Sequence, residues 1–345
     1  MRFSSILVVA LVLEGSALGQ SRPAAQSEPA AQTRPATAPA FEVSPYFGER
    51  IKAYRIEPEV SVHINMPAAE DYDASKPTRL ILYALPNGNT TAQTIGRRME
   101  PGMDWHYNIQ HIGAQVRRLR EAVGDCNWVV AYLEADGKSW PAWKERHKDY
   151  RELIPRIVAD VSKQVESQRR PILYLSGHSG GGSLLFGYVD SFEQIPADVE
   201  RISFLDSDYG YDDDAKHGDK LIAWLRDGRE RVLSVICYDD RNITLDGKLV
   251  VGPTGGTWRK TQRMIERLKK DFELTESPME GLIHLKGLDG RIDILMHPNP
   301  KNAILHTRLV GDMNGLIYTM TVATPAEDVA GKFNGAVAYE KWIQP

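Results

Sequence analysis

The pentapeptide GHSGG at residues 177–181 constrains the fold of this chain more than any other feature. It directly follows a strand-like apolar run (171–175) and directly precedes a helix-like run (182–189). A G-x-S-x-G sequence between a strand and a helix is typical of a nucleophile elbow, a tight turn that strains the serine backbone and exposes its hydroxyl. Glycine is needed on both sides because a Cβ atom would clash with the turn or the following helix. The alternative is a glycine-rich loop with an unused serine, and the order of strand, turn and helix favours the elbow.

The first 40 residues predict two segments that precede the folded part. Residues 1–19 combine a charged start, a short apolar core and small residues before a cut after Gly19, which is the pattern of a secretory signal peptide. Residues 20–40 form a loose Pro/Ala/Gln repeat with almost no bulky apolar side chain, which predicts a disordered tether. We therefore expect an exported protein, periplasmic or extracellular, that is soluble after cleavage and has no transmembrane segment.

Charge and cysteine content exclude some classes of protein. The net charge is −4 and no basic stripe with interleaved aromatic residues occurs, so nucleic acid is not an expected partner. The chain has two cysteines, Cys126 and Cys237, which flank different predicted strands. Because these strands are distant in the chain, we expect both thiols to be reduced rather than joined in a disulfide.

Hydrophobic periodicity predicts strands that alternate with helices over most of the remaining chain. The predicted strands are residues 60–66, 78–85, 127–134, 171–175, 201–205 and 231–237, and the predicted helices are 109–123, 150–165, 182–189, 219–225 and 257–272. Segments 281–286 and 291–297 flank a Leu-Asp-Gly turn and predict a hairpin. This order predicts an α/β fold with a mostly parallel central sheet, helices on both faces and an antiparallel N-terminal edge.

With the elbow, the strands before it and the acidic and histidine residues after it, the chain resembles the α/β-hydrolase superfamily, in particular its secreted esterases and lipases. The resemblance covers nearly all of residues 41–345 and implies a single catalytic domain there. It implies Ser179 as the nucleophile, an acid and a base that follow in that chain order, and no metal or organic cofactor.

The resemblance also indicates which histidine is the base. His284, His297 and His306 follow the acid candidates, and His284 lies within the predicted hairpin. The family carries its base on the loop after the last strand, which favours His306, with His297 as the alternative.

The acid is expected just after the strand at 231–237. Asp239 and Asp240 stand there, and Asp240 is the predicted acid because the family's acid lies a few residues beyond the strand end. Asp208, one strand earlier, is the alternative, since some members carry the acid there. Acidic residues at strand ends also serve simply as turn formers.

An oxyanion hole needs two N–H donors. The resemblance assigns one to Gly180 and the other to the loop Asn87-Gly88, although the His-Gly-Gly-Gly form of many lipases is absent. Four aromatic side chains follow the strands at 78–85 and 127–134 and are predicted to line the substrate site, because ligands bind beyond the carboxyl ends of such strands. They are Trp105, His106, Trp140 and Trp143. The alternative is that the tryptophans pack their loops onto the domain.

The sequence therefore predicts an exported serine hydrolase that cleaves carboxylic esters, with carbohydrate- or polymer-linked esters as a candidate class. A serine peptidase of the same fold and a non-catalytic binding protein that retains the fold are the alternatives. The oligomeric state and the acyl and alcohol specificity stay open.

Overall fold

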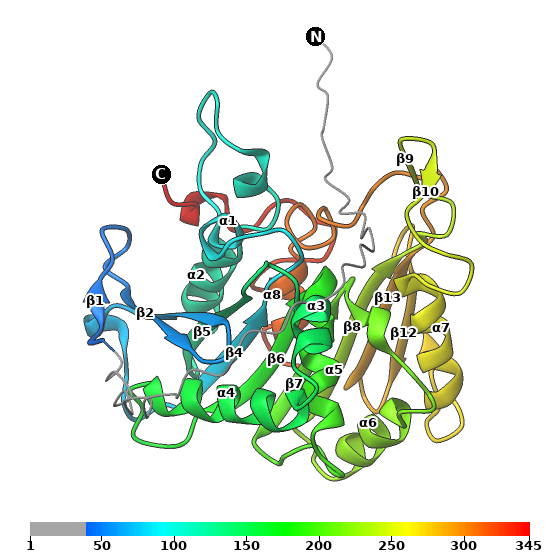
Figure 1. The fold of residues 1–345 in the computed structure, drawn as a ribbon, viewed down its shortest axis with the longest axis horizontal. Coiled ribbons are helices and arrows are strands. Elements are labelled where there is room, and N and C mark those ends of the chain that lie inside the picture. Colours follow the sequence, from blue (N-terminus) through cyan, green and yellow to red (C-terminus); the bar gives the residue numbers. More distant parts are fainter. Residues whose placement is uncertain (1–38) are drawn as a thin grey trace, which may run out of the picture. The chain divides into compact units, whose positions relative to one another are not determined.

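The computed structural model describes residues 39–345. The predicted signal peptide and nearly all of the predicted tether lie outside the described residues. The described part is built on an 11-stranded sheet in the order β1-β2-β3-β5-β4-β6-β7-β8-β13-β12-β11 (Figure 1). Among these residues, no helix has both the length and the apolar character that a membrane span requires.

The centre of the sheet is parallel. It consists of β5 (Asn127–Ala135), β4 (Thr78–Ala84), β6 (Ile172–His178), β7 (Val199–Leu205), β8 (Val232–Tyr238) and β13 (Ile292–His297). These strands are apolar almost throughout because both faces are covered, so successive side chains enter opposite cores. In β4, for example, Leu80 and Leu82 pack into one core, and Ile81 and Tyr83 into the other.

Antiparallel strands form both edges of the sheet. β1 (Glu42–Val43), β2 (Arg50–Ile56) and β3 (Val60–Met66) form the N-terminal edge. β12 (Ile283–Gly287) and β11 (Thr275–Glu276) extend the other edge, so the predicted hairpin of β12 and β13 is confirmed. The sequence did not predict β2, because three basic residues interrupt its apolar pattern near the sheet edge. A separate two-stranded sheet pairs β9 (Thr244–Leu245) with β10 (Lys248–Leu249).

Helices cover both faces of the sheet (Figure 1). One face carries α2 (Ile112–Ala122) and α8 (Gly315–Thr321), and the other carries α4 (Tyr150–Gln164), α5 (Gly182–Asp190), α6 (His217–Arg226) and α7 (Thr257–Leu268). Shorter helices are α1 (Thr91–Ile95) and α3 (Trp140–Arg146), with 3-10 turns η1 (Ala69–Asp71), η2 (Trp105–Asn108), η3 (Ser179–Gly181), η4 (Asp208–Gly210) and η5 (Glu340–Trp342). The predicted helix 109–123 begins only at residue 112, because His111 has a left-handed backbone, with φ +50°.

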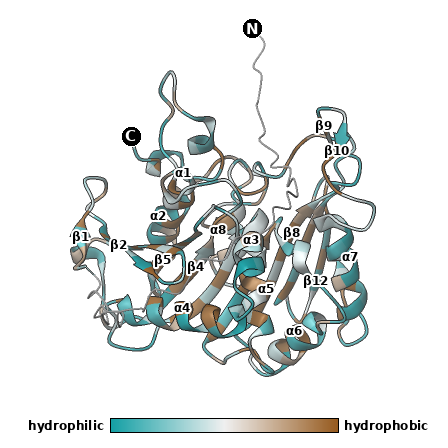
Figure 2. Cartoon of the chain, in the orientation of Figure 1, coloured by the Kyte–Doolittle hydropathy of each residue, from teal (hydrophilic) through white to brown (hydrophobic). Residues whose placement is uncertain are grey.

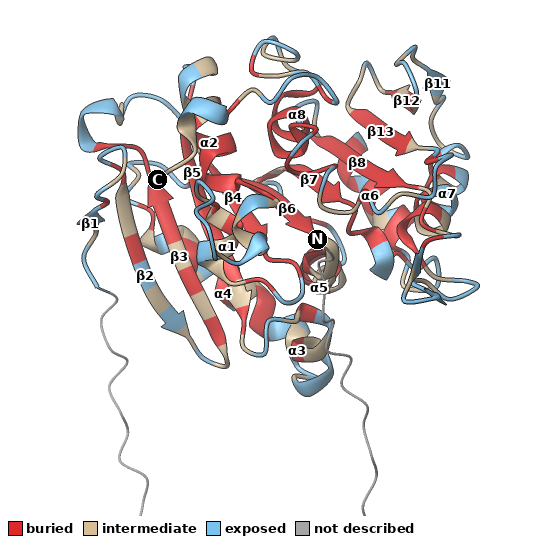
Figure 3. Cartoon of the chain, turned by 90° about the horizontal axis from the view of Figure 1, so that it is seen from above, coloured by how far each residue is buried: buried red, intermediate tan, exposed pale blue. Residues whose placement is uncertain are grey.

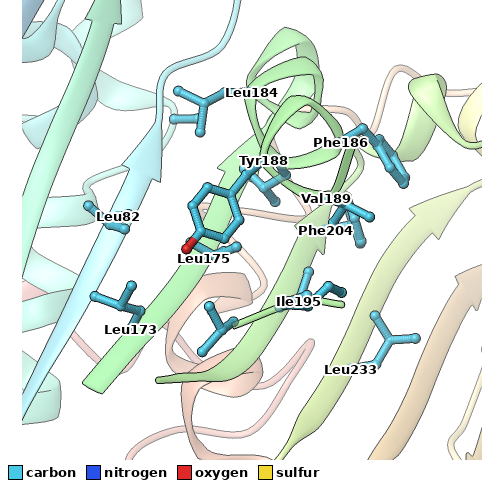
Figure 4. Close-up of a cluster of buried hydrophobic side chains, with 14 of the residues drawn as sticks. Leu82, Leu173, Leu175, Leu184, Phe186, Tyr188, Val189, Ile195, Phe204 and Leu233 are labelled. Atoms are coloured by element: carbon cyan, nitrogen blue, oxygen red, sulfur yellow. The ribbon is translucent and has the colours of Figure 1, made fainter. Parts of the chain in front are cut away.

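The hydrophobic core fixes α5 against the sheet. Figure 4 shows side chains of α5 packed over those of β4, β6, β7 and β8, among them Leu184, Tyr188, Leu82, Leu175, Phe204 and Leu233. Figure 2 shows apolar residues concentrated in the central strands, with hydrophilic residues on the outer sides of the helices. Burying a side chain of this size stabilises the fold by roughly 1.5–3 kcal/mol, so the helix that follows Ser179 is held firmly.

The carboxyl ends of the parallel strands lie along one edge, the upper one in Figure 1, from which α1 and the β9–β10 hairpin continue. Figure 3 looks onto this edge and shows the buried central strands between exposed loops. The predicted α/β architecture, with its mostly parallel sheet and antiparallel N-terminal edge, is confirmed. Cys126 and Cys237 are buried and unpaired, as expected.

Candidate active site

Ser179 lies in a sharp turn between β6 and α5 and has a left-handed backbone, with φ +54°. Residues with a side chain rarely adopt this conformation, and the surrounding structure must hold them in it. A Cβ atom at Gly182 would lie 1.7 Å from the carbonyl oxygen of Ser207, and one at Gly181 would lie 2.2 Å from that of Ala84. Real Cβ contacts essentially never fall below 3.0 Å, so only glycine fits these two positions. The backbone thus has the strand–turn–helix geometry predicted for an elbow, which is the arrangement of the α/β-hydrolase fold.

His306 lies beside this elbow, in the irregular segment after β13. Its backbone carbonyl accepts a hydrogen bond from Nε2 of His178, at 3.0 Å, and the centres of the two rings are 4.4 Å apart. Burial, together with the neighbouring His306, holds the pKa of His178 well below its ordinary value. The His178 ring is therefore neutral and carries its proton on Nε2. Because His178 directly precedes Ser179, these contacts place His306 at the same edge of the sheet as Ser179.

The ring of His306 is oriented by Asp206. Nδ1 of His306 donates a hydrogen bond to Oδ2 of Asp206, whose side chain is fully buried. Asp206 is the first residue after β7 and, like Ser179, has a left-handed backbone, with φ +46°. With a proton on Nδ1, the Nε2 atom of His306 has a free lone pair and can act as a base.

The structure therefore pairs His306 with a different carboxylate from the expected one. Asp240 is buried, but its Oδ2 accepts the backbone N–H of Thr257 at 2.9 Å, and no hydrogen bond joins Asp240 to His306 among residues 39–345. Burial, and secondarily the charge of Asp206, raise the pKa of Asp240 to about 6. Asp240 therefore bonds to the N-terminus of α7, whereas Asp206 is the carboxylate that bonds to His306.

The two other acid candidates are also engaged elsewhere. Asp239 forms an ion pair with Arg241 at 2.6 Å, and this hydrogen bond lowers the pKa of Asp239. Asp208 is fully buried and accepts a hydrogen bond from the hydroxyl of Thr261 at 2.8 Å. Burial raises the pKa of Asp208 to about 8, so this group is largely neutral.

His297, the alternative base, faces its own turn. Its Nδ1 accepts the backbone N–H of Asn299 at 2.9 Å. Burial lowers its pKa. Within residues 39–345 no carboxylate bonds to its ring, so the arrangement favours His306.

The predicted oxyanion loop lies against the elbow, but its two residues, Asn87 and Gly88, make different contacts. A Cβ atom at Gly180 would lie 2.0 Å from Oδ1 of Asn87, so the Asn87 side chain is packed directly against Gly180. The N–H of Gly88 instead donates to the carbonyl oxygen of Lys138 at 2.9 Å. The Gly88 N–H is therefore already engaged and does not fit the predicted role. Gly180 lies in the first turn of η3, where N–H groups have no partner within the helix.

Two of the four predicted aromatic substrate contacts are part of the core instead. Trp140 and Trp143 are 1% and 0% exposed, and their indole N–H groups donate to the carbonyl oxygens of Leu133 and Pro58. The expectation that they line a substrate site is wrong, because α3 turns both indoles inward. Trp105 is 57% exposed and stacks on His106, with ring centres 3.9 Å apart. Their role as substrate contacts stays a prediction.

Sequence reasoning missed three residues of this site. Asp206 directly follows the predicted strand 201–205, as Ser179 directly follows β6 in the structure, and the position just after a strand is a usable signal. Tyr209 is partly exposed, and its ring centre lies 6.4 Å from that of His306. Thr257, at the start of α7, donates a short hydrogen bond from its hydroxyl to Oδ1 of Asp206. No local pattern identifies Tyr209 or Thr257. Within residues 39–345, no group of three or more His, Cys, Asp or Glu side chains is arranged so that it could hold a metal ion.

Comparison with known proteins adds little beyond the architecture. No family model matches the chain, and no curated protein matches it. Among solved structures, a thermostable esterase is similar over 73% of this chain with 12% sequence identity and a TM-score of 0.42, and the match spans only 55% of that esterase. Est1E from Butyrivibrio proteoclasticus matches 75% of this chain and 93% of its own, with 11% identity and a TM-score of 0.38. Dipeptidyl peptidase 4 from Porphyromonas gingivalis matches 74% of this chain and 32% of its own, with 11% identity and a TM-score of 0.37. These values are too low to assign an activity, which has to be argued from the site.

Proposed function

We propose that this chain is an exported serine hydrolase of the α/β-hydrolase superfamily that cleaves carboxylic esters through Ser179, His306 and Asp206. The observation that carries the proposal is the pairing of His306 Nδ1 with the buried Asp206 beside a serine in a strained, left-handed turn. Strain of this kind persists only where the surrounding structure imposes it, and it is concentrated at active sites. Export is proposed from the pattern of residues 1–19.

In the first half of the reaction, Nε2 of His306 removes the hydroxyl proton of Ser179 while the serine oxygen attacks the ester carbonyl. The new C–O bond gives a tetrahedral intermediate whose oxyanion is stabilised by N–H donors. We assign these donors to the backbone N–H groups of Gly180 and Asn87, since the N–H of Gly88 is already bonded to Lys138. One such donor contributes roughly 2.7–4 kcal/mol to stabilising the transition state.

The intermediate collapses when the bond to the leaving alcohol breaks and His306 returns the proton to that alcohol. Water then attacks the acyl-enzyme, again with His306 as the base, and releases the acid and the free Ser179 hydroxyl. Asp206 keeps the Nδ1 proton in place and stabilises the imidazolium that forms in both halves. The reaction as written uses side chains, backbone N–H groups and water.

The structure removes part of the basis for a carbohydrate or polymer ester as the substrate. A rim of tryptophans favoured carbohydrate or polymer esters, but Trp140 and Trp143 are buried. Trp105 remains as an exposed aromatic side chain, with Tyr209 beside His306. Trp105 and Tyr209 support a carboxylic ester that carries either an apolar part or a ring.

The proposal is tested by incubating the protein with a fluorophosphonate and measuring its intact mass, in parallel with a Ser179→Ala variant. We expect one adduct on the wild-type protein, located at Ser179 by peptide mapping, and none on the variant. Short-chain p-nitrophenyl esters and matched p-nitroanilides then separate an esterase from a peptidase. A folded wild-type protein that forms no adduct and cleaves neither substrate contradicts the proposal and favours a binding protein.

A further inference from the structure

Three aspartates are buried together behind His306, and the reaction uses one of them. Asp206 and Asp208 follow β7, and Asp240 follows β8. All three side chains are at most 1% exposed. Asp206 and Asp240 both bond to Thr257, and Asp208 follows Asp206 by two residues, so the three carboxyl groups belong to one cluster. Burial and the like charge of a neighbour both disfavour an ionised carboxyl group, so these aspartates need a structural element that supplies hydrogen-bond donors.

The N-terminal end of α7, on the same side of the sheet as α5 and α6, provides that element (Figure 1). Thr257, the first residue of α7, contacts two of the aspartates. Its hydroxyl donates to Oδ1 of Asp206, and its backbone N–H donates to Oδ2 of Asp240 at 2.9 Å. The preceding Gly256 is pressed against the same carboxyl group, since a Cβ atom there would lie 2.5 Å from Oδ1 of Asp240.

The two oxygens of Asp206 are thereby bound by different partners. Oδ2 accepts from Nδ1 of His306, and Oδ1 accepts from Thr257. Rotation of a carboxylate about its terminal bond is broad and two-fold, so one hydrogen bond alone does not fix its plane. A second donor on the other oxygen does. This donor is rigid because Thr257 is fully buried and α7 is packed through Met264 and Leu268.

We propose that Thr257 is a positioning residue whose hydroxyl orients Asp206 toward His306 while its backbone N–H keeps Asp240 bound to the helix and out of the reaction. This inference rests on the proposed function, because orienting Asp206 affects catalysis only if His306 is the base that Asp206 positions. Thr257 touches neither substrate nor reacting atoms. The hydrogen bond from the backbone N–H of Thr257 also explains why Asp240, at the expected acid position, caps α7 instead.

The same helix provides a matched control. Thr261 lies one turn after Thr257, is also fully buried, and also donates its hydroxyl to a buried aspartate, Asp208, at 2.8 Å. Replacing either threonine by the isosteric valine removes one buried hydroxyl and one hydrogen bond to an aspartate. The two variants therefore have similar structural consequences, but only Thr257 is connected to His306.

The test compares Thr257→Val, Thr257→Ser and Thr261→Val with the wild-type protein. We expect Thr257→Val to lower kcat on a p-nitrophenyl ester by about ten- to hundredfold with KM nearly unchanged, which corresponds to a lost hydrogen bond to a charged group. Thr257→Ser should restore most of kcat, and Thr261→Val should change kcat less than threefold. Unfolding midpoints of all variants show whether stability losses are matched. If Thr257→Val does not fold, Thr257→Ala is compared with Thr261→Ala.

A second measurement does not depend on catalysis. We expect the Nδ1 proton of His306, which is bonded to Asp206, to give a downfield proton resonance that Thr257→Val shifts or broadens and Thr261→Val leaves in place. Equal effects of the two valine variants on kcat and on this resonance, or no effect of Thr257→Val on either, would overturn the proposal. If fluorophosphonate fails to label Ser179 but the resonance responds only to Thr257→Val, the positioning role stands and the hydrolase proposal fails.

Discussion

Ser179 and Asp206 occupy matching places at the ends of neighbouring strands. His178, the last residue of β6, is in register with Leu205, the last residue of β7. Ser179 and Asp206 are the next residues of the two strands, and both have a left-handed backbone, with φ +54° and +46°. The backbone thus leaves the sheet at the same level after both strands. In the proposed triad, His306 from a distant loop can therefore bond to Asp206 and act on Ser179.

Asp206→Asn should lower kcat by about 10³–10⁴-fold. An asparagine presents an amide that favours the wrong histidine tautomer, and the corresponding change in the Ser-His-Asp triad of serine proteases lowers kcat by about 10⁴-fold. Steady-state kinetics and the rate of fluorophosphonate labelling measure the effect. The matched variant is Asp240→Asn, which retains an acceptor for the N–H of Thr257 and should lower kcat less than tenfold. The opposite ranking would mean that Asp240 is the acid.

Gly182→Ala should destabilise the protein by about 3 kcal/mol, the upper end of the usual cost of overpacking, or prevent folding. The added Cβ would lie 1.7 Å from a backbone oxygen that cannot rotate away, so the elbow or the Ser207 segment must shift. The matched control is Gly124→Ala, where no atom lies within 4 Å of the added Cβ. That change should be neutral or stabilise by less than about 1 kcal/mol. Chemical denaturation of both variants measures the difference, and similar results for the two would contradict the elbow geometry.

Asp208→Asn should stabilise the protein increasingly as the pH rises from about 4 to about 8. Burial raises the pKa of Asp208 in the folded state to about 8, whereas an unfolded aspartate titrates near 3.9. Between these values the folded state binds more protons at this site, so the wild-type protein loses stability with rising pH, by up to about 1.4 kcal/mol per pH unit. Asparagine removes this loss and still accepts from Thr261. Urea denaturation of both proteins at pH 5 and pH 8 gives the difference, and a constant difference would show that Asp208 is ionised throughout.

Trp140→Ala and Trp105→Ala should separate a core tryptophan from a surface one. Truncation of the buried Trp140 should cost roughly 3–5 kcal/mol of stability. Truncation of the exposed Trp105 should change the free energy of unfolding by less than about 0.5 kcal/mol. If Trp105 contacts substrate, its truncation raises KM several-fold with little change in kcat. An unchanged KM on every ester cleaved would remove Trp105 from the substrate site.

Local patterns were sufficient for those features that depend on neighbouring residues. The glycines of residues 177–181 and the runs on either side predicted the elbow, because its strand, tight turn and helix follow one another directly in the chain. Continuous apolar runs predicted the parallel strands, since both faces of each strand must be buried. The edge strand β2, with its three basic residues, does not follow that rule and was missed.

The sequence by itself determined the fold class and the place of Ser179, and the family resemblance favoured His306 over His297 as candidate base. Only the tertiary structure decided that Asp206, not Asp240, meets His306, that Trp140 and Trp143 point into the core, and that Thr257 joins two aspartates. The physical reason is that the strand, turn and helix of an elbow are formed by consecutive residues, whereas a hydrogen bond between residues 206 and 306 depends on strand register and on the packing of distant segments. Neighbouring aspartates at strand ends look alike in the chain, and only their burial and partners distinguish them.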